Sequence, residues 1–309
     1  MSAMLMKAAA FDEFGPAEVL RTRQMERPSA ARGEVLIRVM SAGVQLTDAA
    51  IRGGWTPPGA HIVFPQIPGN DFSGIIVGLG PEVEDFALGD EVLGYSMLGS
   101  YAEYAAVPAS QVILKPKELS WDEAGALSAS GQTALTVIED LGIAQGDRVL
   151  VHGAAGGLGT IFTQLAVLSG AEVVGTAGEA NHVHVRSLGA HPVSYGSGEM
   201  DRLSELGGGF DAAFDAAGHE NLRLAVQFVD DRSRIATIVD MALAGELGCR
   251  VVRSRRTADR LGDLARLVAD GRLRVHIRRT FRLDEAAEAH RDVETGHGRG
   301  KIALRIGEP

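Results

Sequence analysis

Cysteine is almost absent from this chain: Cys249 is the only one among its 309 residues. A single thiol excludes a disulfide within the chain and a structural zinc site built from four cysteines. Apolar and basic residues surround Cys249 in a predicted strand, which favours a buried and unreactive thiol.

Long apolar runs and an excess of basic charge are also missing. No apolar run reaches the about 20 residues that a helix needs to span a bilayer. Residues 1–7 have no basic segment before their apolar stretch, so they make a poor signal peptide. We therefore expect a cytoplasmic protein with no membrane span. The net charge of −10 argues against a nucleic-acid partner, and the one basic run, 250–256, is interpreted as the polar rim of a strand.

The remaining composition is that of an ordinary globular protein, with 45 % hydrophobic and 23 % charged residues. At roughly 150 residues per domain, the length predicts two domains. Short strands broken by Gly and Pro predict a small β domain from residues 1–120, to which the strand-like tail 273–309 returns. The predicted strands of this domain are 34–40, 72–80, 91–95, 101–107, 279–283 and 301–306, with a helix at 284–293.

Residues 121–272 follow a different pattern, in which strands and helices alternate. A helix is expected over 121–141, with Ser120 as its N-cap. Strands and helices then follow at 148–152, 158–169, 172–176, 181–188, 210–215, 221–228, 234–239, 250–252 and 261–270. This order predicts a doubly wound parallel sheet, so the fold class is α/β with a separate β domain.

A glycine-rich turn, Gly153 to Gly159, lies directly between the strand 148–152 and the helix 158–169. This is the context in which a dinucleotide pyrophosphate binds, because the backbone must turn tightly and present the N–H groups of a helix N-terminus. The three fingerprint positions are Ala154, Gly156 and Gly159, so an alanine replaces the usual first glycine. The alternative is a tight turn without a ligand.

The residue that follows the next predicted strand, 172–176, helps to distinguish an NAD site from an NADP site. NAD enzymes usually place a carboxylate there to bind the ribose hydroxyls, whereas this chain has Ala177. We therefore expect NADP(H), although Glu179 nearby points the other way. Candidate partners for a 2′-phosphate are Thr176, His182, Arg186 and Tyr195, and for His182 a solvated helix face is the alternative.

The whole chain resembles the zinc-independent quinone oxidoreductases of the medium-chain dehydrogenase/reductase superfamily. The residues that carry the resemblance run from end to end: 6–8, 14–20, 33–39, 42–44 with Asp48, 67–74, 89–92, 99–104, 133–134, the glycine turn, 187–190 and 296–302. The resemblance implies a GroES-like catalytic domain, a Rossmann-type cofactor domain with a cleft between them, NADPH as hydride donor, and often a homodimer.

The resemblance also implies site residues. Catalytic candidates are Gln45, Asp48 and Trp55, with Gln45 donating a hydrogen bond to the acceptor oxygen of a quinone or α,β-unsaturated carbonyl. Candidates for cofactor contacts are Thr133, Ala154, Ala155, Gly156, Gly157, Leu158, Thr176, Ala177, Gly178, His182, Tyr195, Ala217, Ile238 and Val239.

Three departures from related enzymes bear on the chemistry. Quinone oxidoreductases usually have an asparagine where this chain has Gln45. Zinc-dependent relatives have a cysteine and a His-Glu pair where this chain has Gln45 and Asn70-Asp71, so no catalytic metal is expected. Enoyl-thioester reductases use a tyrosine near Gly54, whereas this chain has Trp55, which has no phenolic proton. Trp55 is either an apolar wall over a flat substrate or a core or hinge residue. A polyketide-type enoyl reductase and a non-catalytic NADPH-binding sensor stay open as alternatives.

Overall fold

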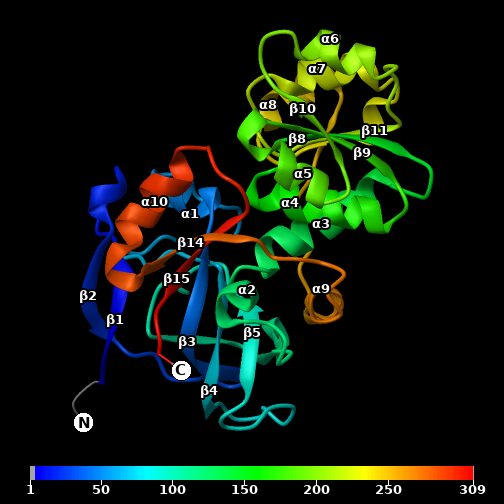
Figure 1. Ribbon diagram of the computed structural model, residues 1–309. Coiled ribbons are helices and arrows are strands. Elements are labelled where there is room, and N and C mark those ends of the chain that lie inside the picture. Colours follow the sequence, from blue (N-terminus) through cyan, green and yellow to red (C-terminus); the bar gives the residue numbers. More distant parts are fainter. Residues whose placement is uncertain (1–3, 309) are drawn as a thin grey trace. The chain divides into compact units, whose positions relative to one another are not determined.

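The computed structural model describes residues 4–308, and the chain divides into two compact units (Figure 1). Unit 1 contains the chain up to Ala129, Thr257–His297 and the residues from Lys301 onward. Unit 2 contains Ser130–Arg256 and Gly298–Gly300. The predicted fold class is confirmed, because unit 1 is built mainly on β-strands and unit 2 on a parallel sheet with helices.

Unit 1 has a seven-stranded sheet of order β14-β15-β3-β4-β5-β7, with β6 also paired to β3, and a separate pair β1-β2. The strands are β1 Leu5–Ala10, β2 Arg21–Glu26, β3 Glu34–Val44, β4 Asp71–Leu79, β5 Glu91–Tyr95, β6 Tyr104–Pro108, β7 Val112–Leu114, β14 Ile277–Arg282 and β15 Lys301–Arg305. The tail returns to this unit as predicted, since β15 pairs antiparallel with β3.

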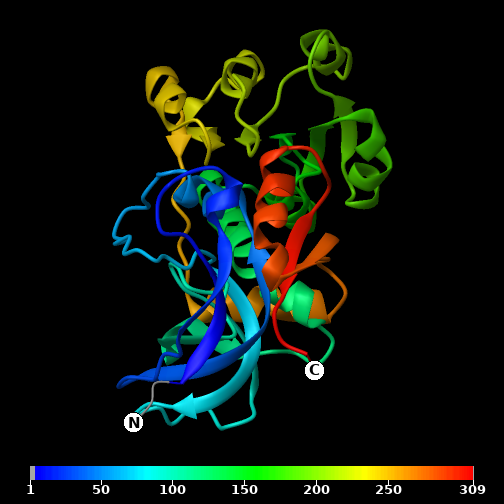
Figure 2. The same ribbon diagram turned by 90° about the vertical axis from the view of Figure 1, so that its left-hand side faces the viewer.

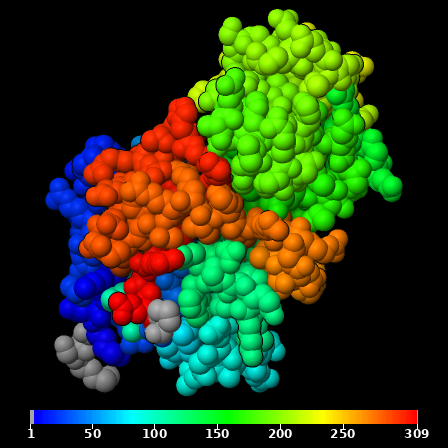
Figure 3. Space-filling view, viewed as in Figure 1, coloured from blue at the N-terminus to red at the C-terminus, as the bar shows by residue number. Residues whose placement is uncertain are grey.

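Four helices complete unit 1: α1 Leu46–Arg52, α2 Trp121–Gly125, α9 Ala258–Ala269 and α10 Ala286–Glu294. Helix α10 packs against α1 and over β14 and β15 (Figures 1 and 2). The C-terminal segment that contains it, drawn in orange and red, covers a broad face of the unit (Figure 3).

The boundaries between the compact units differ from the domain boundaries expected at residues 120 and 272. Helix α2 belongs to unit 1 because it lies directly on β3: a Cβ at Gly43 would be 2.9 Å from the carbonyl oxygen of Gly125. Helix α9 belongs there as well, since it packs against β7. Residues 121–129 and 257–272 are therefore part of unit 1.

The long helix expected over 121–141 is wrong in one respect, because it is broken into α2 and α3 Ser128–Leu141. Helix α2 is held in place by its close packing on β3 and ends at Gly125, and the second helix begins at Ser128. The N-cap prediction is confirmed: the backbone N–H of Glu123 donates to Ser120 Oγ at 3.3 Å, and the Glu123 carboxylate accepts from the Ser120 N–H at 3.0 Å. The helix expected from residue 284 starts two residues later, because α10 begins after a 3₁₀ turn at Leu283–Glu285 and has Glu285 as its N-cap.

Unit 2 has a six-stranded parallel sheet of order β10-β9-β8-β11-β12-β13. Its strands are β8 Arg148–His152, β9 Glu172–Ala177, β10 His191–Ser194, β11 Ala212–Asp215, β12 Ile235–Thr237 and β13 Arg250–Val251. The helices that join them, besides α3, are α4 Gly157–Leu168, α5 His182–Ser187, α6 Glu199–Glu205, α7 Asn221–Phe228 and α8 Met241–Leu247. Strand β10 and helices α6 and α8 were not predicted.

Helices cover both faces of this sheet. Ala213 packs in a buried cluster with Leu222 of α7 and Leu243 of α8. The next residue, Phe214, packs on Phe162 of α4 with ring centroids 4.5 Å apart. Because consecutive strand residues point to opposite faces, α4 lies on the other side of the sheet from α7 and α8. The strand order runs outward in opposite directions from β8, to β9 on one side and to β11 and β12 on the other. The carboxyl ends of these parallel strands therefore lie at the same edge of the sheet.

Candidate functional site

The glycine turn of unit 2 is held by its own backbone in the form that a phosphate needs. Gly153 has a positive φ of 77°, and a Cβ at Gly159 would overlap the Gly153 carbonyl oxygen, so no side chain fits there. Gly156 is the N-cap of α4. Gly156, Gly157 and Leu158 are partly exposed, and the N–H groups of the first helical turn have no partner within the helix. The predicted strand–turn–helix arrangement is present.

The alanine that replaces the first fingerprint glycine is accommodated by a second glycine. Ala154 is fully buried, and a Cβ at Gly175 of β9 would lie 2.5 Å from the Ala154 Cβ. The N–H of Ala154 donates to the Thr176 carbonyl at 3.0 Å, and the Ala155 carbonyl accepts from the N–H of Gly300 at 2.8 Å. Ala154 and Ala155 thus fix the shape of the turn.

A buried polar chain lies beneath the turn. Thr176 Oγ1 accepts from the Gly153 N–H at 3.4 Å and lies 3.4 Å from His152 Nδ1. The same His152 atom is 3.4 Å from a Glu199 carboxylate oxygen, and both side chains are buried. Thr176 therefore supports the turn from inside, while Ala177, also buried, follows it at the end of β9.

Asp215 organises the loops that follow β11 and β12. Its Oδ1 accepts from the N–H groups of Ala217 at 3.0 Å and Gly218 at 2.8 Å, and its Oδ2 from Thr237 Oγ1 at 2.9 Å. Thr237 Oγ1 in turn accepts from the Val239 N–H at 3.0 Å.

These loops lie against the glycine turn. A Cβ at Gly153 would be 3.0 Å from the Ala217 Cβ, and one at Gly218 would be 3.0 Å from Val239 Cγ1. The structure therefore brings the predicted residues Ala217 and Val239 together with the turn. Ile238 is half-buried between Thr237 and Val239, and Thr133 is half-buried on α3.

The other predicted cofactor residues gather where β9 and β10 end. The Tyr195 ring lies beside Gly178, and His182 Nε2 is 3.3 Å from Ser194 Oγ. Sequence reasoning missed Arg202 of α6, whose Nε and Nη2 donate to the Ser194 carbonyl at 3.0 and 2.7 Å. Tyr195 is exposed and Arg202 half-buried, so this corner offers a guanidinium and a phenol beside a small residue.

In unit 1, Gln45 lies just before α1 at the centre of a polar cluster. Its Nε2 donates to Asp71 Oδ2 at 2.8 Å and is 3.5 Å from Asn70 Oδ1. Its Oε1 accepts from Lys301 Nζ at 3.0 Å. Asp71 also accepts from the backbone N–H of Ala129, with both oxygens at 2.9 Å. Asn70, Asp71 and Lys301 are all buried.

Asp48 is fully buried directly behind Gln45. Its Oδ2 accepts from the Gln45 N–H and from the Tyr101 hydroxyl, both at 3.0 Å, and its Oδ1 has no hydrogen-bond partner within residues 4–308. Burial raises the pKa of Asp48 to about 7, with hydrogen bonds opposing the shift and the nearby Asp71 charge adding to it. The pKa of Tyr101 is raised well above its usual value, mainly by burial and then by Asp48. Asp48 and Tyr101 therefore form a buried, hydrogen-bonded support for the start of α1.

A second buried group packs on Tyr101 from α10. The His290 ring is edge-on to the Tyr101 ring, with centroids 5.7 Å apart, and neither ring nitrogen has a hydrogen-bond partner among the described residues. Burial, and to a lesser extent the Arg52 charge, lowers the pKa of His290 to about 3. Arg52 is itself buried and pairs with Glu294 of α10.

Trp55 lies in the loop that follows α1, and 43 % of its surface is exposed. It is therefore not a core residue. Nearby, Phe14, Phe64 and Phe11 form an aromatic cluster with centroids 5.2 to 6.3 Å apart, and a Cβ at Gly54 would contact the Phe14 side chain. Phe14 and Phe64 are also exposed, so this part of unit 1 presents an apolar surface.

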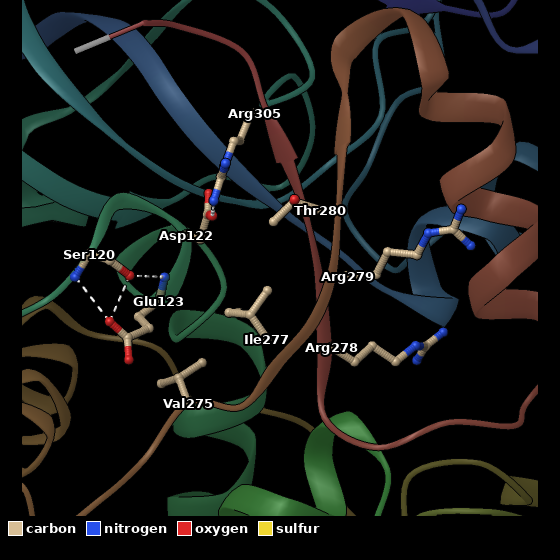
Figure 4. Close-up of a pocket in the computed structure, with 9 residues that line it drawn as sticks. All are labelled: Ser120, Asp122, Glu123, Val275, Ile277, Arg278, Arg279, Thr280 and Arg305. Carbon is tan, nitrogen blue, oxygen red and sulfur yellow. Dashed lines mark hydrogen bonds and ion pairs between the residues drawn. The ribbon is translucent and has the colours of Figure 1, made fainter.

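A separate polar depression of about 460 Å³ lies elsewhere in unit 1 (Figure 4). Its arginine side chains are already paired: Arg305 with Asp122 at 2.7 Å, and Arg278 and Arg279 with Asp292. It lacks a side chain from the Gln45 cluster and is lined by Ser120, Asp122, Glu123, Val275, Ile277, Arg278, Arg279, Thr280 and Arg305.

In the part of the chain that the structure describes, no three His, Cys, Asp or Glu side chains are grouped so that they could hold a metal. None of the helices within residues 4–308 is both long and apolar enough to cross a membrane.

Comparison with known proteins agrees with both units. Residues 31–117 match the family model described as an alcohol dehydrogenase GroES-like domain, and residues 188–304 match that of a zinc-binding dehydrogenase. Mouse quinone oxidoreductase is 30 % identical, covering 98 % of each chain. A chloroplastic NADPH-dependent alkenal/one oxidoreductase of Arabidopsis thaliana is 29 % identical over 97 % of this chain and 79 % of its own length. The structure of the quinone oxidoreductase from Coxiella burnetii superposes with a TM-score of 0.89 at 30 % identity, covering 98 % of this chain and all of the other.

Proposed function

We propose, because the chain belongs to the quinone oxidoreductase family of the medium-chain dehydrogenase/reductase superfamily, that it is a zinc-independent NADPH-dependent reductase of quinones or α,β-unsaturated carbonyls. The relatives support an oxidoreductase in general terms, whereas the cofactor, the metal independence and the acceptor class are our proposals. The observation that carries them is a glycine turn shaped for a pyrophosphate, found in the same chain as a carboxamide held by a lysine and an aspartate.

The residues of the turn fit a dinucleotide. A side chain is excluded at Gly159 by the Gly153 carbonyl, whereas a Cβ at Gly156 would meet only that carbonyl, at 3.3 Å, and otherwise faces open space. The Gly156 N–H, which we expected to bind phosphate, donates to the Gly153 carbonyl at 3.0 Å. We propose that the N–H groups of Gly157 and Leu158 hold the pyrophosphate at the positive end of α4. Thr133, Ala217, Ile238 and Val239 would contact the rest of the cofactor, and the bound reduced nicotinamide supplies the hydride.

The preference for NADPH rests on the corner where β9 and β10 end. No carboxylate replaces the buried Ala177, and Gly178 leaves room beside Tyr195. Arg202 adds a cation that can bind a 2′-phosphate, together with His182. One relative, the Arabidopsis alkenal/one oxidoreductase, is named as NADPH-dependent.

Gln45 is proposed to bind the acceptor oxygen. One N–H of its Nε2 is used by Asp71, and the second has only Asn70 Oδ1 at 3.5 Å, the outer limit of a hydrogen bond. That N–H can donate to the oxygen on which negative charge develops when hydride adds to the conjugated carbon. The acceptor gains the hydride and one proton. We propose that solvent supplies the proton, because Asp48 is buried and its Oδ2 already accepts hydrogen bonds from Gln45 and Tyr101. Asp48 would thus position Gln45, and Trp55 would form an apolar wall over the acceptor.

The same side chains argue against a catalytic zinc. A carboxamide nitrogen that donates to Asp71 is not a zinc ligand, and the Lys301 ammonium within 3.0 Å of Gln45 Oε1 would repel a dication. The expected absence of a metal stays a prediction, and metal analysis of the purified protein tests it.

Two measurements test the proposed function. NADPH and NADH are titrated against thermal stability, where a ligand at 100 times its Kd adds about 2.7 kcal/mol. NADPH oxidation is then followed with panels of quinones and enones. If neither cofactor changes the stability, the proposed cofactor site is wrong; if NADPH binds but no acceptor is reduced, the protein is a non-catalytic NADPH-binding protein.

An enoyl reductase of a polyketide-type pathway is a second candidate. Its support is a 31 % identity over 89 % of this chain to 5 % of the polyketide synthase GfsB of Streptomyces halstedii. An enoyl-thioester included in the acceptor panel decides between the two.

A homodimer and a cytoplasmic location stay predictions, which gel filtration and cell fractionation test. The Arabidopsis relative is named as a chloroplast protein.

A further inference from the structure

Lys301 is the feature of the Gln45 cluster that the proposed function leaves unexplained. It is the first residue of β15, and its side chain is 4 % exposed. Its backbone N–H donates to the His276 carbonyl at 2.7 Å, and its Nζ donates to Gln45 Oε1 at 3.0 Å. A lysine whose ammonium is withdrawn from solvent is uncommon unless its charge is paired or hydrogen-bonded.

The neighbours of Gln45 allow its carboxamide only one orientation. An ammonium group can only donate hydrogen bonds, and an ionised carboxylate can only accept them. The oxygen of Gln45 must therefore face Lys301, and its nitrogen must face Asp71 at 2.8 Å. The flipped carboxamide would place N–H against the ammonium and oxygen against the carboxylate, losing both hydrogen bonds in a buried setting.

Charge on both sides also changes how strongly the carboxamide donates. A cation bound to an amide oxygen draws electron density from the amide nitrogen, and hydrogen bonds arranged in series strengthen one another. Lys301 acts electrostatically on Asp48 as well, where its charge opposes the rise in the pKa of that carboxyl. The cluster therefore has a cation next to two buried carboxylates, Asp48 and Asp71.

We propose that Lys301 is a positioning residue for the reduction: its ammonium locks the Gln45 carboxamide in the orientation that presents Nε2, and it polarises that amide toward the acceptor oxygen. The inference rests on the proposed function, because it assigns to the acceptor the second N–H of Gln45, which otherwise has Asn70 Oδ1 at 3.5 Å. Lys301 acts through Gln45 and does not itself touch the acceptor. In this way the chain places a positive charge behind the oxyanion donor.

A double-mutant cycle tests this role. Lys301→Met is expected to lower kcat about ten-fold, the size of one lost charge-assisted hydrogen bond, with the Kd for NADPH unchanged. Gln45→Ala is expected to lower kcat by about 10². Combining the two should reproduce Gln45→Ala alone, because Lys301 has nothing left to orient. Losses that multiply in the double variant, or an unchanged kcat in Lys301→Met, would overturn the proposal.

Charge and folding are controlled by further variants. Lys301→Arg keeps the cation and should recover part of kcat, whereas Lys301→Gln keeps a donor without charge and should not; Lys301→Gln also serves if Lys301→Met fails to fold. Lys115→Met is the matched control. Lys115 is a half-buried lysine of unit 1 with a side chain that is 5 % exposed. It pairs with Glu91 at 3.1 Å and donates to the Leu119 carbonyl at 2.9 Å, away from Gln45. Its variant should match wild type in kcat.

A readout without turnover separates this inference from the proposed function. The side-chain amide protons of Gln45 are observed by ¹⁵N NMR and assigned with Gln45→Ala. Lys301→Met should move both resonances strongly upfield, whereas Lys115→Met should leave them in place. If the resonances do not move in Lys301→Met, the inference is wrong. If they move but wild type reduces no quinone or enone, Lys301 still orients Gln45 and only the proposed function fails.

Discussion

Replacing Gly156 by valine should abolish dinucleotide binding while leaving unit 2 folded. Gly156 has φ −67° and ψ 174°, a conformation that any residue adopts, so valine introduces no backbone strain. A Cβ there meets only the Gly153 carbonyl oxygen, at 3.3 Å. The two added methyl groups would extend into the space in front of the first turn of α4, where we place the pyrophosphate.

The size of the effect follows from the hydrogen bonds that are lost. With the phosphate displaced, at least two N–H donors of the turn lose a charged acceptor, at about 1.5 kcal/mol each. A loss of about 3 kcal/mol corresponds to a rise in Kd of roughly 100-fold. The free energy of unfolding without cofactor should change by less than about 1 kcal/mol, because nothing buried is disturbed.

Gly159→Ala is the matched comparison, since its Cβ would overlap the Gly153 carbonyl oxygen. It should destabilise the protein by about 1–3 kcal/mol before any cofactor is added. Isothermal titration with NADPH and chemical denaturation of each variant separate the two effects. An unchanged Kd in Gly156→Val would refute the placement of the pyrophosphate, and a large loss of stability in that variant would refute the reading of the turn as open at Gly156.

Three further predictions concern charge. The folded pKa of Asp48 is about 7, above its usual 3.8, so the unfolded chain gives up this proton first and stability should fall as pH rises from about 4 through 7. Asp48→Asn should flatten that fall in denaturation at several pH values; an equal slope in both proteins would contradict the assignment. The pKa of His290 is lowered to about 3 from 6.5, so its contribution is complete above pH 6.5 and is lost as pH falls toward 3. His290→Phe should therefore unfold less readily in acid, and an unaltered acid transition would count against this account. Arg202→Ala should weaken NADPH binding about ten-fold and leave NADH binding nearly unchanged, measured by titration; equal losses for both would show that Arg202 does not bind a 2′-phosphate.

The sequence predicted those parts of the molecule whose determinants are close together in the chain. The turn at Gly153 to Gly159 is defined by seven consecutive residues between a strand and a helix, and the Ser120 cap by a residue three positions further on. Each is settled by local backbone geometry, which a short sequence pattern reports directly.

The side-chain cluster around Gln45 could not be predicted in this way. Asp71 is 26 residues away from Gln45 and Lys301 is 256 residues away, so the contacts depend on how β15 pairs with β3. Sequence patterns marked Asp71, Tyr101 and Lys301 as members of matching motifs, and Asp71 also as a replacement at a zinc-ligand position. None of these patterns placed the three residues around Gln45 and Asp48. Arg202 was missed because α6 itself was not predicted. Its signal was the Glu199 to Glu205 segment, too short for a clear helical period.

The Ala154 position shows why a departure from a sequence fingerprint need not be a departure from its structure. The fingerprint asks for a glycine because the turn packs tightly on the neighbouring strand. Here the methyl group of Ala154 occupies space that a Cβ at Gly175 would otherwise fill, 2.5 Å away. The volume shared by the turn and β9 is therefore one methyl group, and either residue can supply it. Since β8 and β9 are adjacent and in register, with Val151 opposite Gly175, the compensating glycine lies on the next strand. A sequence pattern confined to the turn includes the alanine but not Gly175, the glycine on the next strand that accommodates it.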